Sequence, residues 1–168
     1  MAVAAGCASP ASQLRVDQPG TSGRQREMHL VSDWSYFALG DQRDRYLLLF
    51  PLPGATGGDE QFALYLRAAK GRGPRGAGVL LPEAPRFDGF FIQMRGERKG
   101  LTNLMSGLME VKGVALTGER RRRIELQAQC EDGTILNGTC LVSEERFRVR
   151  DFEDRRAADV AALDGQAP

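Results

Sequence analysis

The stretch Ile124-Glu-Leu-Gln-Ala-Gln-Cys130 alternates apolar or small residues with polar ones, and Asp132-Gly133 follows two positions later. Successive side chains of a β-strand point to opposite faces, so this alternation predicts a strand with one buried and one solvated face. An Asp-Gly pair after such a run is a strong hairpin signal. The stretch therefore predicts an antiparallel hairpin with one face in a core; its solvated side chains are Glu125, Gln127 and Gln129.

The neighbouring segments are also short apolar runs separated by glycine and proline, the pattern of an all-β sandwich or barrel. Residues 46–50 (Tyr-Leu-Leu-Leu-Phe) are apolar on both faces and predict a central strand that is covered on both sides. Residues 62–67 and 90–95 alternate, and the glycines within 104–116 favour bent strands over a helix. The predicted fold class is mainly β: an antiparallel β-sandwich or small barrel with one C-terminal helix.

The C-terminal part predicts one more strand and then that helix. The strand is expected from about residue 140 to 149, with a bulge or break near 143–145 where the apolar residues change phase. Asn137-Gly138 predicts a second turn or a bulge. Residues 151–163, rich in alanine, predict the helix, and 164–168 are expected to be frayed.

The 168 residues suffice for one domain behind an N-terminal tail. Residues 8–27 are mostly polar, with Leu14 and Val16 as the only sizeable apolar side chains. Such a segment buries too little surface to offset its ordering entropy. We therefore expect residues 1–27 to be a signal remnant and disordered tether, and 28–163 to be the folded domain.

The overall charge and hydrophobicity exclude several functional classes. The 23 basic and 22 acidic residues nearly cancel, for a formal net charge of +1. A global field that recruits nucleic acid or an anionic membrane is therefore not expected. The chain also has no apolar run of about 20 residues, the length that a membrane-spanning helix needs.

The N-terminal residues Val3-Ala-Ala-Gly-Cys7-Ala8 resemble the bacterial lipobox, the cleavage site of lipoprotein signal peptides. Ala4 stands where that family usually has leucine. The resemblance implies that the true start lies upstream of Met1, and that Cys7 becomes an acylated N-terminus holding the protein at a membrane. It further implies that the protein is lipid-anchored in the cell envelope, on the periplasmic side of the membrane or at the outer membrane. In that family, a residue other than Asp after the cysteine, here Ala8, permits sorting to the outer membrane. If these residues are not a lipobox, the expected location is the cytoplasm.

The two remaining cysteines leave two alternatives open. In an extracytoplasmic protein a Cys130–Cys140 disulfide is the default. A two-residue turn at Asp132-Gly133, however, places Cys140 opposite Glu125, roughly 17 Å along the ladder from Cys130, which is beyond bridging reach. A disulfide requires residues 131–139 to form a wider loop. The alternative is a pair of buried, reduced thiols.

A basic run precedes the alternating strand, at a predicted turn, and is a candidate site for phosphates or acidic lipid headgroups. The more common interpretation is a solvated run paired with nearby glutamates. No aromatic residues interleave with it, which argues against single-stranded nucleic acid as the partner. The run consists of Arg120, Arg121, Arg122 and Arg123.

No catalytic constellation is recognisable. His29 is the only histidine, so every histidine-dependent triad must use it, and no serine motif accompanies it. We expect His29 to lie on the surface or at a strand edge. Two cysteines and one distant histidine are too few ligands for a metal site, and no glycine-rich phosphate loop occurs. The sequence therefore predicts no catalytic residue, metal or cofactor.

Together these features predict a membrane-tethered cell-envelope lipoprotein that acts as a non-catalytic binding or structural module. Its partners are the membrane, through lipid on Cys7, and a protein or envelope polymer. The alternatives are a small barrel holding an apolar ligand lined by residues 101–116, a carboxylate-pair hydrolase, and a cytosolic anion- or nucleic-acid-binding domain. Trp34, Tyr36, Phe90 and Phe91 are expected mostly in the core, although Phe91 is opposite in phase to Phe90 and is a partner contact if exposed. The ligand and oligomeric state stay open.

Overall fold

The computed structural model describes residues 11–20, 22–51, 60–70, 74–77, 86–95, 98–116 and 119–165. Strands dominate this part of the chain, which confirms the predicted fold class. The strands are β1 (Ser12–Pro19), β2 (Gln25–Ser32), β3 (Trp34–Ala38), β4 (Arg43–Pro51), β5 (Glu60–Ala69), β6 (Arg75–Ala77), β7 (Phe87–Arg95), β8 (Arg98–Leu116), β9 (Glu119–Cys130) and β10 (Ile135–Glu144). The helices are α1 (Arg146–Arg155) and α2 (Ala157–Asp164).

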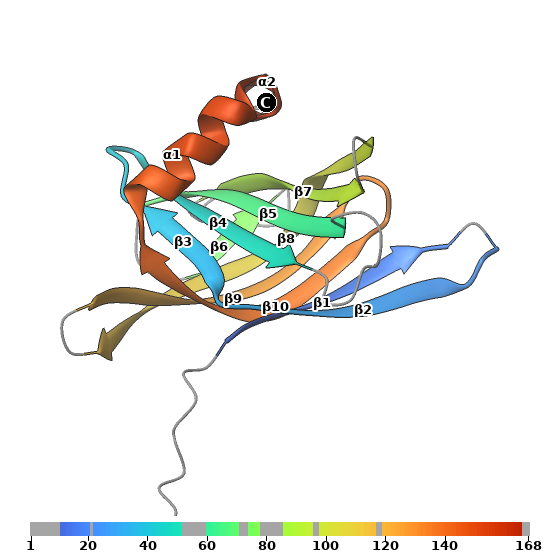
Figure 1. The fold of residues 1–168 in the computed structure, drawn as a ribbon, viewed down its shortest axis with the longest axis horizontal. Coiled ribbons are helices and arrows are strands. Elements are labelled where there is room, and N and C mark those ends of the chain that lie inside the picture. Colours follow the sequence, from blue (N-terminus) through green and yellow to red (C-terminus); the bar gives the residue numbers. More distant parts are fainter. Residues whose placement is uncertain are drawn as a thin grey trace, which may run out of the picture.

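Seven of the described strands close into a barrel, in the order β10-β3-β4-β5-β7-β8-β9, with β9 returning to β10. Only the β3–β10 contact in this ring is parallel. Three strands lie outside the ring. β1 pairs with the first half of β10 and with β2, and β6 pairs with β8. The β1–β2 hairpin projects from the barrel at a distance from α1 and α2 (Figure 1).

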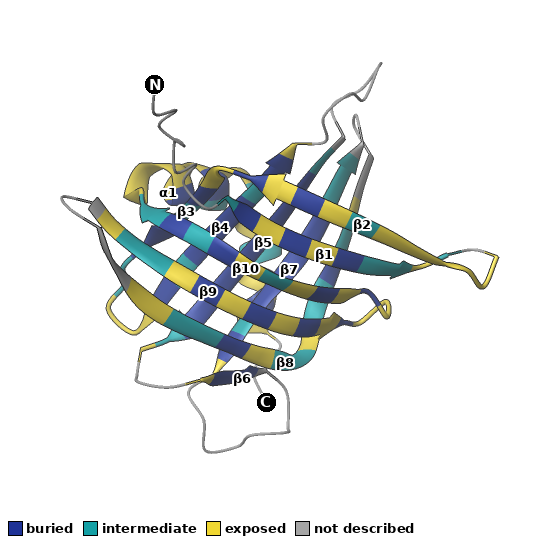
Figure 2. Ribbon diagram, turned by 90° about the horizontal axis from the view of Figure 1, so that it is seen from below, coloured by how far each residue is buried: buried dark blue, intermediate teal, exposed yellow. Residues whose placement is uncertain are grey.

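Alternate residues of each strand build the barrel interior. On β9, the side chains from Ile124 to Cys130 are buried at every second position, as predicted, and the positions between them are exposed (Figure 2). Phe62, Leu64 and Leu66 of β5 follow the same rule. The interior is therefore one apolar cluster to which nearly every strand of the ring contributes.

The strands β4, β5 and β7 are buried on their outer faces as well, because the helices lie there. Val149 and Phe152 of α1 and Leu163 of α2 pack on this outer wall. The Phe152 ring stacks on Tyr65 and Phe90, with centroid distances of 5.8 and 6.4 Å. The prediction that residues 46–50 form a doubly covered strand is thus confirmed.

The prediction of a disordered tether over residues 8–27 is wrong for the described part of that segment. β1 begins at Ser12, and the Leu14 and Val16 side chains are buried in the barrel core. Pairing with both β2 and β10 supplies the buried surface that the segment lacks by itself. Residues 12–19 therefore belong to the folded domain. Cys7 lies outside the described residues.

The C-terminal prediction needs a second correction. β10 ends at Glu144 and α1 begins at Arg146, so the phase change marks a strand-to-helix transition, not a bulge. Val149 is buried as a helical residue, whereas Phe147, expected to point inward, is 75% exposed. The single predicted helix is in fact two, α1 and α2, which break at Arg156.

Asn137-Gly138 is neither a turn nor a bulge, because β10 runs straight through it. A Cβ at Gly138 would lie 2.3 Å from the carbonyl oxygen of Gln13, so glycine permits the close approach of β1. The prediction of strand over helix for residues 104–116 is confirmed, because β8 runs through this segment. The β8–β9 register shifts between Leu104 and Ser106, one residue before Gly107 adopts a φ of 153°.

The structure corrects the prediction for Trp34 and decides the one left open for Phe91. Trp34 is 52% exposed at the start of β3 and does not belong to the core. Phe91 is 1% exposed and stacks on Phe62 inside the barrel, with a centroid distance of 5.6 Å. Phe91 is therefore not a partner contact; it faces the interior, while Phe90 on the other face of β7 lies under the helices.

Candidate binding surface

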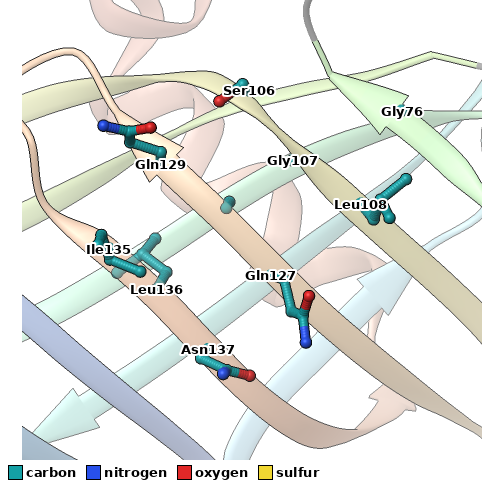
Figure 3. Close-up of a pocket in the computed structure, with 10 residues that line it drawn as sticks. Gly76, Ser106, Gly107, Leu108, Gln127, Gln129, Ile135, Leu136 and Asn137 are labelled. Carbon is teal, nitrogen blue, oxygen red and sulfur yellow. The ribbon is translucent and has the colours of Figure 1, made fainter. Parts of the chain in front are cut away.

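A groove of about 610 Å³ lies on the barrel wall formed by β8, β9 and β10, with β6 at its side (Figure 3). The side chains that line it are uncharged: amides and one hydroxyl for hydrogen bonding, and two exposed aliphatic groups. The lining consists of Gly76, Ser106, Gly107, Leu108, Gln127, Ala128, Gln129, Ile135, Leu136 and Asn137.

Strand register brings these side chains together. Gln127 and Gln129 point outward because their neighbours on β9 fill the interior. Across the sheet, Gln127 pairs with Leu108 of β8 and with Asn137 of β10. Gln129 pairs in the same way with Ile135. Each row across the three strands therefore combines an amide with an aliphatic side chain.

Gly107 shapes the floor of this groove. A Cβ at this position would lie 2.3 Å from the carbonyl oxygen of Gln127 and 2.7 Å from the Cα of Ala128. Its φ of 153° also lies where side chains are disfavoured. Because Gly76 of β6 pairs with Leu108 beside it, two glycines leave the space next to the amides open.

A second hollow, of about 360 Å³, lies on β10, β1 and β2, and Asn137 lines both hollows. Two polar side chains of this hollow have a partner on β2. The Arg15 guanidinium lies 3.2 Å from the Glu27 carboxylate, and the His29 ring nitrogen lies 2.7 Å from the same carboxylate. His29, with an exposed side chain on β2, occupies the surface strand position that the sequence predicted.

The four arginines that precede the alternating strand do not form one patch. Arg122 shares the phase of Ile124 and points into the end of the barrel. Its guanidinium donates to the Asp44 carboxylate at 2.7 Å and to the Tyr46 hydroxyl at 2.9 Å. It also lies over the Phe37 ring, 4.6 Å from its centroid. The alternation of the sequence already indicates that Arg122 faces inward, because it lies two residues before Ile124.

Arg122 remains charged in this setting. Burial opposes the charged guanidinium, but the Asp44 carboxylate and the Tyr46 hydroxyl hold the pKa of Arg122 above its usual value. For Tyr46, burial raises the pKa of the hydroxyl, although the Arg122 guanidinium opposes the rise. At the surface, the Arg120 guanidinium lies 3.5 Å from the Glu144 carboxylate. The basic run is thus divided between an internal ion pair and the outside of the barrel.

Both described cysteines are free, buried thiols in the interior cluster. The turn has three residues, since the Cys130 N–H donates to the Thr134 carbonyl, so Cys140 pairs with Ile124. That register puts Cys140 six residues along β9 from Cys130, roughly 20 Å, and no disulfide joins them in this structure. Burial raises the pKa of both thiols to about 12, which suppresses the reactive thiolate.

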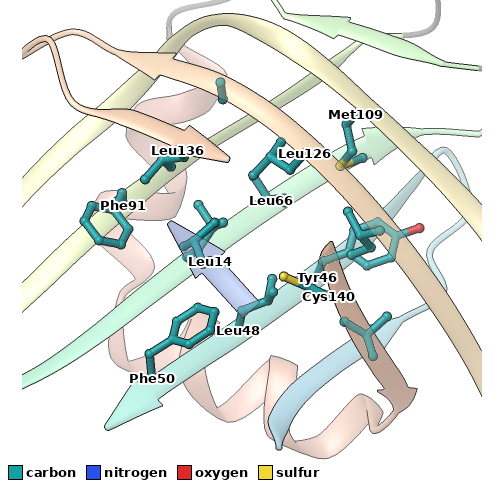
Figure 4. Close-up of a cluster of buried hydrophobic side chains, with 14 of the residues drawn as sticks. Leu14, Tyr46, Leu48, Phe50, Leu66, Phe91, Met109, Leu126, Leu136 and Cys140 are labelled. Atoms are coloured by element: carbon teal, nitrogen blue, oxygen red, sulfur yellow. The ribbon is translucent and has the colours of Figure 1, made fainter. Parts of the chain in front are cut away.

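Large side chains occupy the interior between the described strands (Figure 4). Phe50, Phe91 and Tyr46 project into it from β4 and β7 and are almost fully buried. Of the segment 101–116 expected to line a ligand cavity, Met109 points inside, but Met105 and Leu108 are exposed on the outside. The described interior residues form one apolar cluster, against which Leu104 and Val111 of the same segment also pack. The uncharged hollow on the outer wall is the candidate binding site.

Other kinds of site are not apparent in the described part of the chain. Neither helix there is long and apolar enough to cross a membrane. No group of three or more His, Cys, Asp or Glu side chains in that part is arranged to hold a metal ion. Comparisons with protein-family models, curated proteins and solved structures gave no match.

Proposed function

We propose that this protein is a non-catalytic binding module of a bacterial cell envelope, tethered through Cys7, whose groove on β8–β10 binds a hydroxyl-rich polymer such as the glycan strands of the cell wall. The observation that carries the proposal is the uncharged groove on the barrel wall, in which three side-chain amides stand among mostly apolar lining residues. The fold supplies rigidity through its packed interior.

The chemistry of the lining fits sugar hydroxyls. A side-chain amide both donates and accepts hydrogen bonds, as a hydroxyl does, so Gln127, Gln129 and Asn137 match a polyol. Leu108 and Ile135, 46% and 43% exposed, offer apolar contact to the faces of sugar rings. The groove is open, and a second hollow lies beside it with Asn137 in both linings, an arrangement that suits an extended polymer better than a small enclosed ligand.

The same lining supports binding over catalysis. Ser106 is the single hydroxyl among the lining residues, and the lining contains neither a histidine nor a carboxylate to activate it. Nucleophilic or acid–base catalysis needs such a partner within hydrogen-bonding distance.

The lipobox-like residues at the N-terminus support the tether. Since β1 begins at Ser12, Cys7 is five residue steps from the first strand of the barrel domain. A fully extended chain of that length spans about 18 Å at most. Acylation of Cys7 would therefore hold the domain close to the bilayer surface.

The groove is tested by co-sedimentation of the full chain with purified peptidoglycan sacculi, using a Cys7→Ser background so that no lipid contributes. We expect the protein to pellet with the sacculi, and Gln127→Ala/Asn137→Ala to weaken binding roughly tenfold, since two hydrogen bonds are lost. The matched control is Gln25→Ala/Gln42→Ala, which removes two exposed glutamine amides outside both grooves. Failure to pellet, or equal losses in both double variants, would overturn the proposal.

The tether is tested separately by expressing the gene in a bacterium with its native upstream DNA and measuring intact mass and detergent partition. A product that begins at Cys7, carries a diacylglyceryl-sized increment and enters the detergent phase supports the envelope address. A product that begins at Met1 and stays in the aqueous phase contradicts the tether, whatever the result for the groove.

A further inference from the structure

The first turns of α1 carry an exposed aromatic residue between arginines. Phe147 is 75% exposed, more than any other large hydrophobic residue in the described chain, whose exposed members lie between 43% and 55%. Val149 and Phe152 on the same helix are buried against the barrel. Phe147 therefore lies on the outer face of α1, flanked in sequence by Arg146 and Arg148.

The charges around Phe147 are mostly uncompensated. Arg146 and Arg148 make no ion pair or hydrogen bond with the described residues. The Arg150 guanidinium lies 3.9 Å from Asp154, but both side chains are more than 70% exposed, so this pair contributes little. With Glu145 as the one acidic residue, the segment from 145 to 150 carries a formal charge of +2.

These residues work against the stability of the helix that carries them. Cations near a helix N-terminus face the positive end of the helix dipole. The first turn of α1 has no acidic residue, and Glu145 makes no side-chain capping hydrogen bond. Exposing a phenylalanine gains nothing for folding either. Residues that lower the stability of their own helix are expected where a surface binds a partner.

We propose that Arg146, Phe147, Arg148 and Arg150 form a contact with an anionic phospholipid bilayer. Phe147 enters the boundary between headgroups and acyl chains, and the guanidinium groups pair with lipid phosphates. A basic segment attracts anionic lipid by about 1 kcal/mol per Lys or Arg, and aromatic side chains favour the membrane interface. Charge complementarity and the projecting ring together favour a bilayer over nucleic acid, which calls for several stacking aromatics along a groove.

The position of this patch is compatible with the binding groove. Seen from below, β9 and β10 lie in front of the barrel and α1 lies behind them (Figure 2). A bilayer against α1 thus leaves the β8–β10 wall accessible. The contact does not depend on acylation of Cys7, although a short lipid tether would raise the effective concentration of the patch at the membrane.

The test is co-sedimentation of the full chain carrying Cys7→Ser, which cannot be acylated, with two kinds of vesicle: phosphatidylcholine alone, and phosphatidylcholine mixed with phosphatidylglycerol. We expect binding only to the anionic vesicles, weakened by added salt. Phe147→Ser should weaken binding roughly tenfold. Arg146→Gln/Arg148→Gln should weaken it by more than tenfold, at about fivefold per charge.

Matched controls separate the patch from general charge and hydrophobicity. Arg24→Gln/Arg26→Gln removes two exposed arginines from the distant β1–β2 hairpin, and Val31→Ser removes an exposed aliphatic group. Both should leave vesicle binding unchanged. The proposal is overturned if anionic vesicles do not bind, if the controls lose as much as the patch variants, or if a single-stranded oligonucleotide binds with the same dependence on Phe147. Thermal unfolding of each variant checks that the fold persists.

Discussion

The barrel has two walls that share one interior and differ on the outside. The wall of β4, β5 and β7 is covered by α1 and α2, so its outward side chains are also buried. Among the described residues, no helix covers the outside of the wall of β8, β9 and β10, which presents amides to solvent. The sequences differ in the same way: residues 46–50 are continuously apolar, whereas 124–130 alternate.

This difference separates stability from binding. On the covered wall, Leu47, Tyr65 and Phe90 contribute buried area on the outer face. On the open wall, Gln127 and Gln129 contribute almost none, because they are exposed. Substitutions on the two outer faces should therefore have opposite signatures: large effects on stability in one case, and effects on binding alone in the other.

The largest expected effect is on the covered wall. Phe152→Ala removes a ring that is 4% exposed and stacks on two aromatic neighbours, and should lower the free energy of unfolding by about 3 kcal/mol or more. Phe147→Ala, five residues earlier on the same helix, should change it by less than about 0.5 kcal/mol. Urea unfolding monitored by circular dichroism measures both. Similar losses in the two variants would mean that α1 does not cover the barrel.

The next effect concerns the ion pair at the barrel end. Asp44→Asn removes the carboxylate partner of Arg122, whose side chain is 26% exposed. Because Arg122 keeps some solvent and the Tyr46 hydroxyl, we expect a loss of about 2 kcal/mol, less than for a fully buried pair. The double variant Asp44→Asn/Arg122→Met should be less destabilised than the sum of the single variants. Strict additivity in urea unfolding would contradict the pairing.

Alkaline pH should produce a smaller, graded effect. Burial raises the pKa of Cys130 and Cys140 from 9.0 to about 12. The unfolded chain therefore releases these protons first, so their contribution is complete below about pH 9 and is lost as the pH rises towards about 12. Cys130→Ala/Cys140→Ala should flatten the decline of unfolding free energy over this window. An unchanged slope would show that the thiols are not buried as neutral groups.

The smallest expected effect on stability is on the open wall. Gln127→Ala/Asn137→Ala should change the free energy of unfolding by less than about 0.5 kcal/mol per site, because both side chains are exposed. Combined with the expected loss of sacculus binding, this result would separate the two walls most clearly. A large loss of stability would mean that these amides support the fold.

Local patterns predicted the strands well. Alternation identified the inner and outer faces of β9, and continuous apolarity identified the doubly covered β4, because burial acts on each strand separately. The same alternation, extended two residues before Ile124, places Arg122 inside the barrel. An arginine is stable there because Asp44, which is distant in sequence, is its partner.

Features that depend on distant partners were not predictable. Leu14 and Val16 carry too little apolar surface to indicate a strand, and β1 is buried because it pairs with β2 and with β10, which lies more than 100 residues later. The groove has the same origin: Gln127 and Gln129 were recognised as solvated, but their alignment with Asn137 requires the β9–β10 register. A Gly at position 138 resembled a turn because the close approach of β1 was not visible in the sequence.

The most direct test of the two-wall account is to map amide chemical shifts by ¹H–¹⁵N NMR while solubilised glycan fragments of peptidoglycan are added to the Cys7→Ser protein. The account predicts shifts concentrated at Leu108, Gln127, Gln129 and Asn137, with the covered wall of β4, β5 and β7 unchanged. Shifts concentrated on the covered wall or within the barrel interior, or no shifts at all, would contradict it.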